Sequence, residues 1–262
     1  MVANLIKKLG KKLYSLLAVF IFLLIWEVAP RVGLADPIFV PPFSKVILAF
    51  FQLIISGEMF KDVLISLQRA IIGFGLALII AVPLGLLIGW FDRIEKFLDP
   101  LLQTFRQTSA LALLPVFILI FGIGEVSKVA IIFWGVQWPI LLNTISGVKT
   151  VDPLLIKSAR SMGASPLTLF IKVILPGAFP SIFTGIRLSA TSAILILIAA
   201  EMIGSNSGLG FLIYESQVKI EVPNMYAAIL SIAILGLVVN YLLVLLGKKI
   251  MKWNDDTSII NE

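Results

Sequence analysis

Two residue types that enzymes often use for catalysis are missing from this chain. Its 262 residues contain no histidine and no cysteine, which excludes imidazole general bases, thiol nucleophiles, disulfides and metal sites built on either side chain. The sequence also lacks the loop Gly-x-x-x-x-Gly-Lys-Ser/Thr, which cradles the phosphates of a bound nucleotide. We therefore expect a protein that is not an enzyme, with no catalytic residue, no metal site and no cofactor bound by this chain.

A small set of polar and charged residues stands inside or beside long apolar runs. Polar groups at membrane depth need partners or water, so these side chains could line a passage or could bond between helices. The arginines could equally be interfacial anchors whose long side chains reach the membrane surface, and the glutamate could be solvated at the interface. The residues that could line such a passage are Arg69, Gln137, Asn143, Arg187 and Glu201.

The composition indicates that lipid is the solvent for most of the chain. Apolar residues make up 59% of the sequence and charged residues 14%, against about 45–50% and about 25% in soluble domains. The first apolar run, Leu13 to Trp26, has no small-residue cleavage site after it, so we expect it to remain as an anchor. The net charge of +6 then has to be explained by topology rather than by nucleic acid.

The apolar runs predict six transmembrane helices in one all-α domain over residues 1–262. A helix needs about 20 apolar residues to cross the hydrocarbon core, and these runs are continuous rather than alternating, which favours helices over strands. The expected spans are about 13–30, 68–91, 108–124, 128–148, 184–204 and 226–246, with residues 149–183 between the fourth and the fifth.

The lysines and arginines predict the orientation of these spans. With the N-terminus in the cytoplasm, 15 of the 21 basic residues fall on the cytoplasmic side. Cytoplasmic loops carry an excess of basic residues, so we expect both termini to be cytoplasmic.

Small residues recur at every fourth position along the second expected span. Such a stripe lets another helix approach closely, but it does not say whether the neighbour belongs to the same chain or to a second copy. The fifth expected span repeats the pattern with Gly185, Ser189 and Ala193. The stripe of the second span consists of Gly73, Ala77, Ala81, Gly85 and Gly89.

The segment between the fourth and fifth spans begins with a helix start signal. Asp152-Pro153 reads as an N-cap followed by proline at the first helical position. Residues 154–162 can then form a helix, and Gly163 supplies a left-handed stop. This helix is expected to expose the small residues Ser158, Ala159 and Ser161, which suit insertion into a groove of a partner protein.

A second short helix is expected directly afterwards. Ser165-Pro166 repeats the start signal, and residues 167–175 form the helix, which Pro176 is expected to end. The two short helices would be joined by a fixed turn at Gly163-Ala164 on the cytoplasmic side.

At these residues the sequence resembles a known motif. The run from Lys157 to Ser165, followed by Ile174-Leu175-Pro176, is similar to the "EAA" loop in permease subunits of bacterial ABC importers. That family pattern is Glu-Ala-Ala-x-x-x-Gly, then a spacer and Ile-x-Leu-Pro. Two positions depart from it, because Lys157 stands where glutamate is typical and Ser158 where alanine is typical.

Other stretches resemble the sulfonate, nitrate and taurine branch of these permeases, and the resemblance covers residues 26–252. It implies the type I ABC importer permease fold with cytoplasmic coupling helices. The stretches are Ser66-Leu67-Gln68-Arg69, Phe121-Gly122-Ile123-Gly124-Glu125 with Lys128, and Ala200-Glu201-Met202-Ile203 leading to Gly208-Leu209-Gly210.

The resemblance also implies partners and a cargo. The permease would form a homodimer in the bacterial inner membrane. Two cytoplasmic ATPase subunits, which use ATP and Mg, would dock on it. An extracytoplasmic solute-binding protein would deliver a small anion such as a sulfonate, nitrate or taurine. No nucleic-acid partner is expected. The residues expected to couple to the ATPase are Lys157, Ser158, Ala159, Arg160, Ser161, Gly163, Ala164 and Pro176.

The main alternative is a secondary transporter driven by an ion gradient. Such a protein would be expected to show inverted repeats and ionisable relays at the membrane midplane, and no convincing repeat relates residues 1–130 to residues 131–262. An intramembrane enzyme and a structural scaffold explain the residues less well, because the first lacks catalytic groups and the second leaves the paired short helices without a role.

Overall fold

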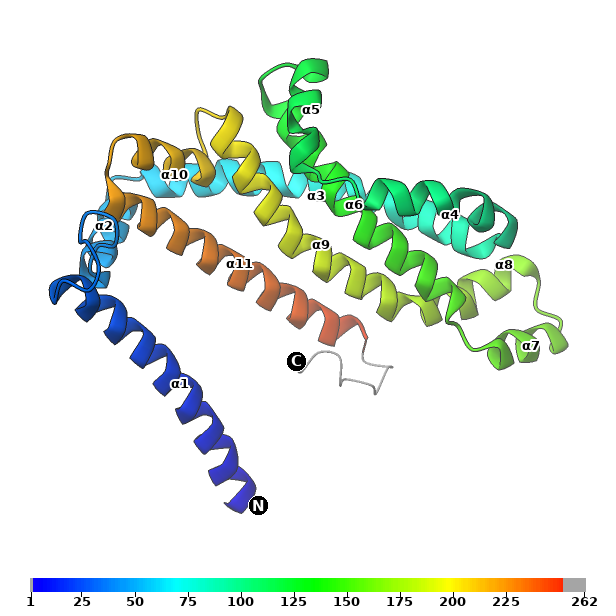
Figure 1. The fold of residues 1–262 in the computed structure, drawn as a ribbon. Helices are drawn as coiled ribbons and strands as arrows, with labels where there is room; N and C mark the ends of the chain where they lie inside the picture. Colours follow the sequence, from blue (N-terminus) through cyan, green and yellow to red (C-terminus); the bar gives the residue numbers. More distant parts are fainter. Residues whose placement is uncertain (1, 252–262) are drawn as a thin grey trace. The chain divides into compact units, whose positions relative to one another are not determined.

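The structure is a computed structural model that describes residues 2–251, with side chains for residues 17–251. These residues fold into helices and contain no β-strand (Figure 1). The side chains of four N-terminal lysines and of Lys252, which contribute to the expected orientation, lie outside the described residues. The elements are α1 (Val2–Arg31), α2 (Phe43–Ile55), α3 (Glu58–Trp90), α4 (Asp92–Arg106), the 3₁₀ turn η1 (Leu111–Leu113), α5 (Leu114–Phe121), α6 (Glu125–Lys149), α7 (Pro153–Ser161), α8 (Pro166–Leu169), the π turn η2 (Phe170–Ile174), α9 (Leu175–Gly204), α10 (Leu209–Val218) and α11 (Val222–Ile250).

The chain divides into two compact units. The first unit combines Met1–Lys61 with Leu212–Ser231, and the second combines Asp62–Phe211 with Ile232–Glu262. The functional features described below all belong to the second unit.

In the first unit, Trp26 joins segments that are far apart in the sequence. Its indole Nε1 donates a hydrogen bond to the carbonyl oxygen of Pro41 at 3.1 Å. Its ring lies 5.3 Å from that of Phe43 and 5.7 Å from that of Tyr226, measured between centroids. Aromatic pairs at such distances contribute beyond their buried area, so Trp26 fixes α1 to the start of α2 and to α11.

Four helices of the described residues are long and apolar enough to cross a membrane: α3, α6, the helix from Pro166 to Gly204, and α11. They contain the second, fourth, fifth and sixth expected spans, and α1 contains the first. Each helix is longer than the apolar run that predicts it, because helices continue into the polar regions on either side of the hydrocarbon core.

The third expected span, residues 108–124, is not one straight helix. α5 has only 8 residues, about 12 Å at 1.5 Å per residue. The chain bends by 79° between α4 and the η1–α5 segment, and the two together make a bent fifth candidate span. Two local features explain the bend: Thr108 and Ser109 have side chains that compete for backbone hydrogen bonds, and Pro115 is confined to the first turn of a helix.

The small-residue stripe of α3 packs against α6 of the same chain. A Cβ atom added to Gly73 would lie 2.8 Å from Cβ of Ile132, and one added to Gly85 would lie 2.6 Å from Cβ of Thr144. Both separations are shorter than atoms tolerate, and Gly89 meets α6 in the same way. The glycines therefore set how closely the two backbones approach.

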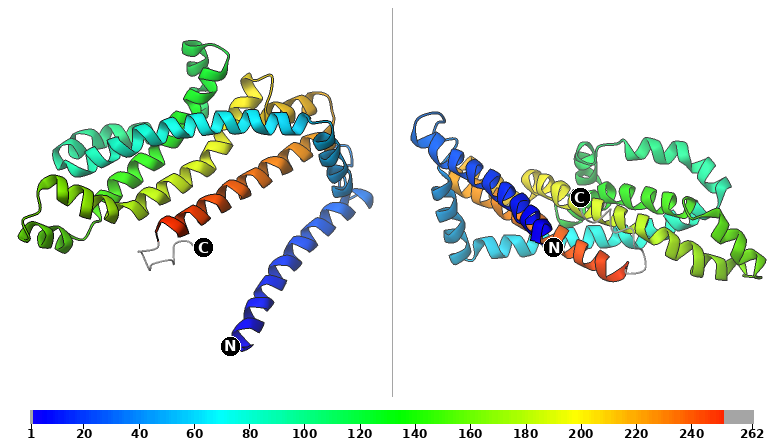
Figure 2. Two further views of the ribbon diagram at one scale, coloured as in Figure 1. Left: turned by 180° about the vertical axis from the view of Figure 1, so that it is seen from behind. Right: turned by 90° about the horizontal axis from the view of Figure 1, so that it is seen from below.

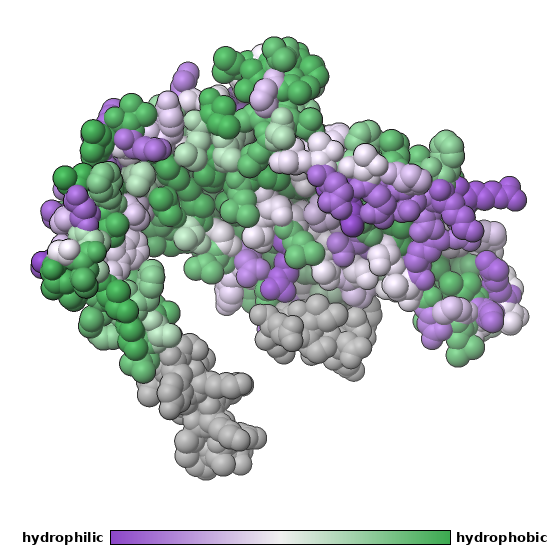
Figure 3. Space-filling view, viewed as in Figure 1, coloured by the Kyte–Doolittle hydropathy of each residue, from purple (hydrophilic) through white to green (hydrophobic). Residues whose placement is uncertain are grey.

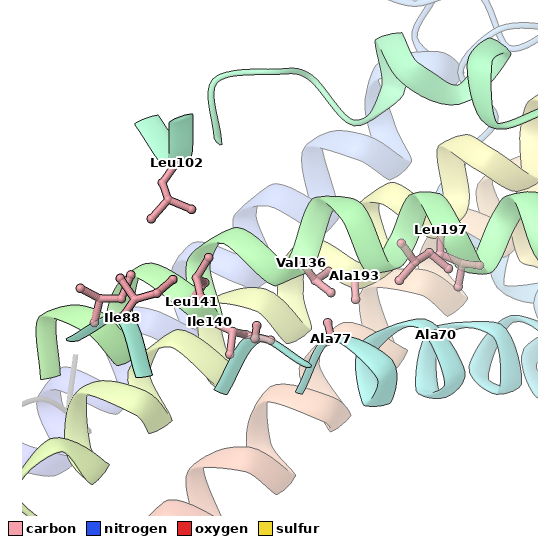
Figure 4. Close-up of a cluster of buried hydrophobic side chains, with 12 residues drawn as sticks. Ala70, Ala77, Ile88, Leu102, Val136, Ile140, Leu141, Ala193 and Leu197 are labelled. Carbon is pink, nitrogen blue, oxygen red and sulfur yellow. The ribbon is translucent and has the colours of Figure 1, made fainter. Parts of the chain in front are cut away.

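The alanines of the stripe occupy the centre of the same contact. Ala77 is 0% and Ala81 1% exposed, and both belong to a buried cluster that includes Val136 of α6 and Ala193 of α9. Figure 4 shows Ala77, Val136 and Ala193 gathered where the three helices meet. The core of this unit is thus built around α6.

An adjoining face of α6 carries α9, and the two helices run side by side (Figure 1, Figure 2). A Cβ atom on Gly185 would lie 2.7 Å from Cβ of Asn143, so only glycine fits there. The hydroxyl of Ser189 donates to the carbonyl oxygen of Val136 at 2.8 Å. Small residues and an interhelical hydrogen bond are the usual means of holding helices together in lipid.

Pro176 does not end the second short helix, so that prediction is wrong. α8 continues through η2 into α9, and residues 166–204 form one helix of 39 residues. Proline lacks an N–H and clashes with the carbonyl four residues earlier in a regular helix. The π turn bonds each residue to one five positions away, which widens the backbone directly before Pro176 and accommodates the ring.

Candidate functional site

The segment between α6 and α9 has the start and stop signals that its sequence predicts. The carboxylate of Asp152 accepts a hydrogen bond from the backbone N–H of Leu154 at 2.8 Å, and α7 begins there. Gly163 adopts φ +77°, the left-handed conformation that favours glycine. The hydroxyl of Ser165 accepts from the N–H of Thr168 at 3.2 Å and caps α8. Each short helix is therefore bounded by its own local hydrogen bonds.

The inner face of this segment packs against the N-terminal end of α9. Ala159 is 6% exposed and lies in a cluster with Leu169, Ile174 and Ala178. The expectation that Ala159 is exposed is therefore wrong: α7 turns this residue inward, which fixes α7 on α8 and η2. Ala164 is half-buried.

The outer face of α7 combines cations with exposed apolar side chains. Lys157, Ser158, Arg160, Ser161 and Gly163 are exposed, and Figure 3 shows hydrophobic and hydrophilic side chains side by side over α7. Pro176 is exposed at the start of α9. The apolar members, which sequence reasoning missed, are Leu154, Leu155 and Met162, at 68%, 55% and 81% exposure.

These apolar residues carry a signal that the sequence already contains. They stand in a segment too polar to span the membrane, and exposed apolar patches are typical of interaction sites for proteins, membranes or ligands. Here the surface consists of Leu154, Leu155 and Met162, with Lys157 and Arg160 beside them. We call this set the α7 surface.

A second feature is a buried ion-pair cluster centred on Arg69. Its Nη1 donates to Oε1 of Glu201 at 2.7 Å, while its Nε and Nη2 donate to the two carboxylate oxygens of Glu125 at 2.5 and 2.6 Å. Nη1 also donates to the backbone oxygen of Ser207 at 2.7 Å. Arg69 is 3% and Glu201 0% exposed, so Glu201 is not a solvated interfacial residue.

The carboxylate of Glu201 is saturated with donors. It accepts from the hydroxyl of Ser66 at 2.9 Å and from the backbone N–H of Gly210 at 2.9 Å. Gly208, at φ +109°, has no room for a side chain because a Cβ atom would collide with this carboxylate. A buried charge is tolerated only when it is paired and hydrogen-bonded, and Glu201 meets both conditions.

The cluster is balanced in charge and ties four helices together. Lys128, which is 4% exposed, donates to Glu125 at 3.1 Å, so two cations face two carboxylates. The members come from α3, α6, α9, the turn after α9 and the start of α10, where Gly210 lies. Such an arrangement has no spare group for proton relay, and its contribution is to hold the α9–α10 turn against α3.

The remaining path candidates lie elsewhere. Nε of Arg187 donates to Oδ1 of Asn240 on α11 at 3.2 Å. Nδ2 of Asn143 donates to the carbonyl oxygen of Pro139 at 2.8 Å, and Gln137 is half-buried on α6. The structure thus brings Arg69 and Glu201 together in a closed cluster and leaves the other three apart from it.

The chain matches a family model over more than half of its length. Residues 73–252 match the model described as "Binding-protein-dependent transport system inner membrane component". The chain therefore belongs to this family: it is a multi-pass permease subunit of an ABC importer. This membership rules out the alternative of a secondary transporter.

Individual relatives cover most of the chain. The putative aliphatic sulfonates transport permease protein SsuC of Bacillus subtilis (strain 168) is 37% identical over 253 residues, which cover 95% of this chain and 92% of that protein. The taurine transport system permease protein TauC of Escherichia coli (strain K12) is 30% identical over 241 residues, or 90% and 88% of the two chains. An inward-facing structure of the MetNI methionine ABC transporter shares the fold, with a TM-score of 0.61 at 18% identity over 76% of this chain and 96% of that chain.

Proposed function

We propose that this permease forms the membrane passage for a small organic anion of the sulfonate and taurine class. The names of the relatives from B. subtilis and E. coli support this cargo. A solute-binding protein would deliver the anion to the outer face, and both termini would lie in the cytoplasm. Two copies of the chain would form the passage.

We further propose that a separate ATPase subunit docks on the α7 surface and supplies the energy, using ATP and Mg. One observation carries this step. On one short helix, Leu154, Leu155 and Met162 are exposed next to the cations Lys157 and Arg160. Apolar anchors flanked by charges are typical of protein interfaces. Because Ala159 packs against the N-terminal end of α9, movement of the docked helix would be transmitted to a membrane-spanning helix.

Replacement of Gly163 tests the coupling. No heavy atom lies within 4 Å of a Cβ added at this position, so Gly163→Val acts through the backbone: valine disfavours φ +77°, whereas asparagine tolerates it. In a reconstituted importer, Gly163→Val should abolish ATP hydrolysis stimulated by the binding protein, and Gly163→Asn should keep most of it. Normal stimulation in the valine variant would count against the proposal.

The cargo is tested separately. Uptake of labelled alkyl sulfonates, taurine and nitrate should be measured with the unmodified importer and its own binding protein. Dependence on ATP with preference for an alkyl sulfonate or for taurine supports the proposed class, and ATP-driven uptake of nitrate alone or of an uncharged solute alone would overturn it.

A further inference from the structure

A cavity of about 630 Å³ lies where the bend between α4 and η1 meets α6 and α9. Its size is within the range of roughly 300–1,000 Å³ that small-molecule sites occupy. Polar groups line the side next to the bend, where Arg106, Thr108 and Ser109 stand, and Asn143 and Ser192 add polar groups from α6 and α9.

The position of this cavity along the helices is the first reason to regard it as a site. The residues of α6 that line it run from 135 to 143, near the middle of Glu125–Lys149. Irregular backbone at such a depth occurs only where protein buries it or where it lines a water-filled cavity. Interrupted helices at the midplane also form the substrate sites of other transporters.

The charge of the lining is the second reason. Arg106 is the one charged residue among the lining residues, and no carboxylate is among them. Within the described part of the chain, Arg106 has no ion-pair partner, in contrast to the fully paired Arg69. Arg106 is exposed, so its planar guanidinium donors are free to bind an oxyanion that enters the cavity.

The aromatic and aliphatic lining residues are the third reason. Trp138 lines the cavity, and its ring is held 5.2 Å from that of Trp134 and 6.0 Å from that of Phe105, measured between centroids. Leu142 and Leu195 add aliphatic side chains to the lining. A ligand with an anionic head and a short apolar chain therefore matches both kinds of lining residue.

We propose that this cavity is a binding site for the cargo within the membrane, where Arg106 holds the anionic head group and Trp138 contacts the apolar part. The inference rests on the proposed function, since it assigns the transported anion a binding site along the passage. Arg106 is a binding residue in this assignment, and Thr108 and Ser109 supply neutral donors.

Because the chain contains no cysteine, single thiols can test the electrostatics of the cavity without any transport assay. Ser109→Cys should be placed in the complete reconstituted importer and treated with 2-sulfonatoethyl methanethiosulfonate or with its trimethylammonium counterpart. Each rate is normalised to that of the same reagent with a small thiol in solution. The anionic reagent should react faster, by about tenfold for one nearby charge at an intermediate dielectric.

Variants of Arg106 decide whether this residue causes the preference. Arg106→Gln should remove the preference for the anionic reagent, and Arg106→Lys should retain it because the positive charge remains. An unchanged preference in the Arg106→Gln variant would overturn the assignment. No reaction of the thiol with either reagent would also overturn it, because the cavity would then be filled by another segment or by a second copy.

Uptake distinguishes failure of this site from failure of the proposed function. If the unmodified importer takes up a sulfonate and Arg106→Gln lowers that uptake at least fivefold while Arg106→Lys does not, the site is supported. Unchanged uptake in Arg106→Gln overturns the site and leaves the function intact. Charge selectivity at the thiol without any ATP-driven sulfonate uptake supports an anion site and overturns the cargo class instead.

Discussion

Nη1 of Arg69 lies 2.7 Å from Oε1 of Glu201, although 132 residues separate the two in the chain. The pair joins α3 to the end of α9, and both side chains are withdrawn from solvent. Breaking a buried pair leaves an uncompensated charge, which costs more than the pair itself contributes. This relationship makes the cluster a structural clamp rather than part of an open passage.

We predict that Glu201→Gln destabilises the protein. The glutamine keeps the shape and one acceptor but leaves Arg69 with a single carboxylate partner, so the free energy of unfolding should fall by about 3 kcal/mol. The measurement is the midpoint of thermal unfolding of the purified permease in detergent. Glu215→Gln is the matched control: Glu215 pairs with Lys219 at 2.8 Å on the exposed surface, where a single ion pair contributes little. An equal midpoint for both variants would contradict the prediction, because hydrogen bonds from Arg69 to Glu125 and Ser207 alone would then be enough to stabilise its buried charge.

Two glycines of α3 give a second prediction, because they differ in what surrounds them. Gly85→Ala would place a Cβ atom 2.6 Å from Cβ of Thr144 and 2.9 Å from the carbonyl oxygen of Leu141, whereas the same change at Gly75 meets no atom within 4 Å. Overpacking of this kind costs about 1–3 kcal/mol, and alanine in an open helical position gains up to about 1 kcal/mol over glycine. Thermal unfolding should therefore show a lower midpoint for Gly85→Ala and an unchanged or higher one for Gly75→Ala. The opposite order would show that α3 does not rest on α6 as described.

The local signals of the sequence predicted most of the segment between α6 and α9. The N-caps at Asp152 and Ser165 and the left-handed Gly163 depend on neighbours only a few residues away. Pro176 is the exception, because a π turn that accommodates a proline leaves no clear sequence signal. The inward position of Ala159 depends on its packing against α9, so it could not be predicted from the neighbouring sequence either.

The ion-pair cluster shows the limit of sequence reasoning. Ser66, Arg69, Glu125, Glu201 and Gly210 come from three stretches that each carry part of the family resemblance, and the structure brings them together. No pattern within any one stretch says that it meets the others, since the contacts depend on how α3, α6 and α9 pack. The spacing of the glycines predicted a close helix contact, but only the structure identifies α6 as the partner.

The orientation of the chain is the last prediction, and it follows from the distribution of basic residues. Basic residues gather in cytoplasmic segments, and Lys157 and Arg160 stand beside the Gly163 turn, so Ser161 should face the cytoplasm and Ser56 the outside. Both residues are exposed, and because this chain has no native cysteine, a label on the purified permease can come only from the introduced thiol. In intact cells a membrane-impermeant maleimide should label Ser56→Cys and leave Ser161→Cys unlabelled until the membrane is permeabilised. Labelling of Ser161→Cys in intact cells would place the α7 surface on the wrong side for a cytoplasmic ATPase, and the proposed coupling could not operate.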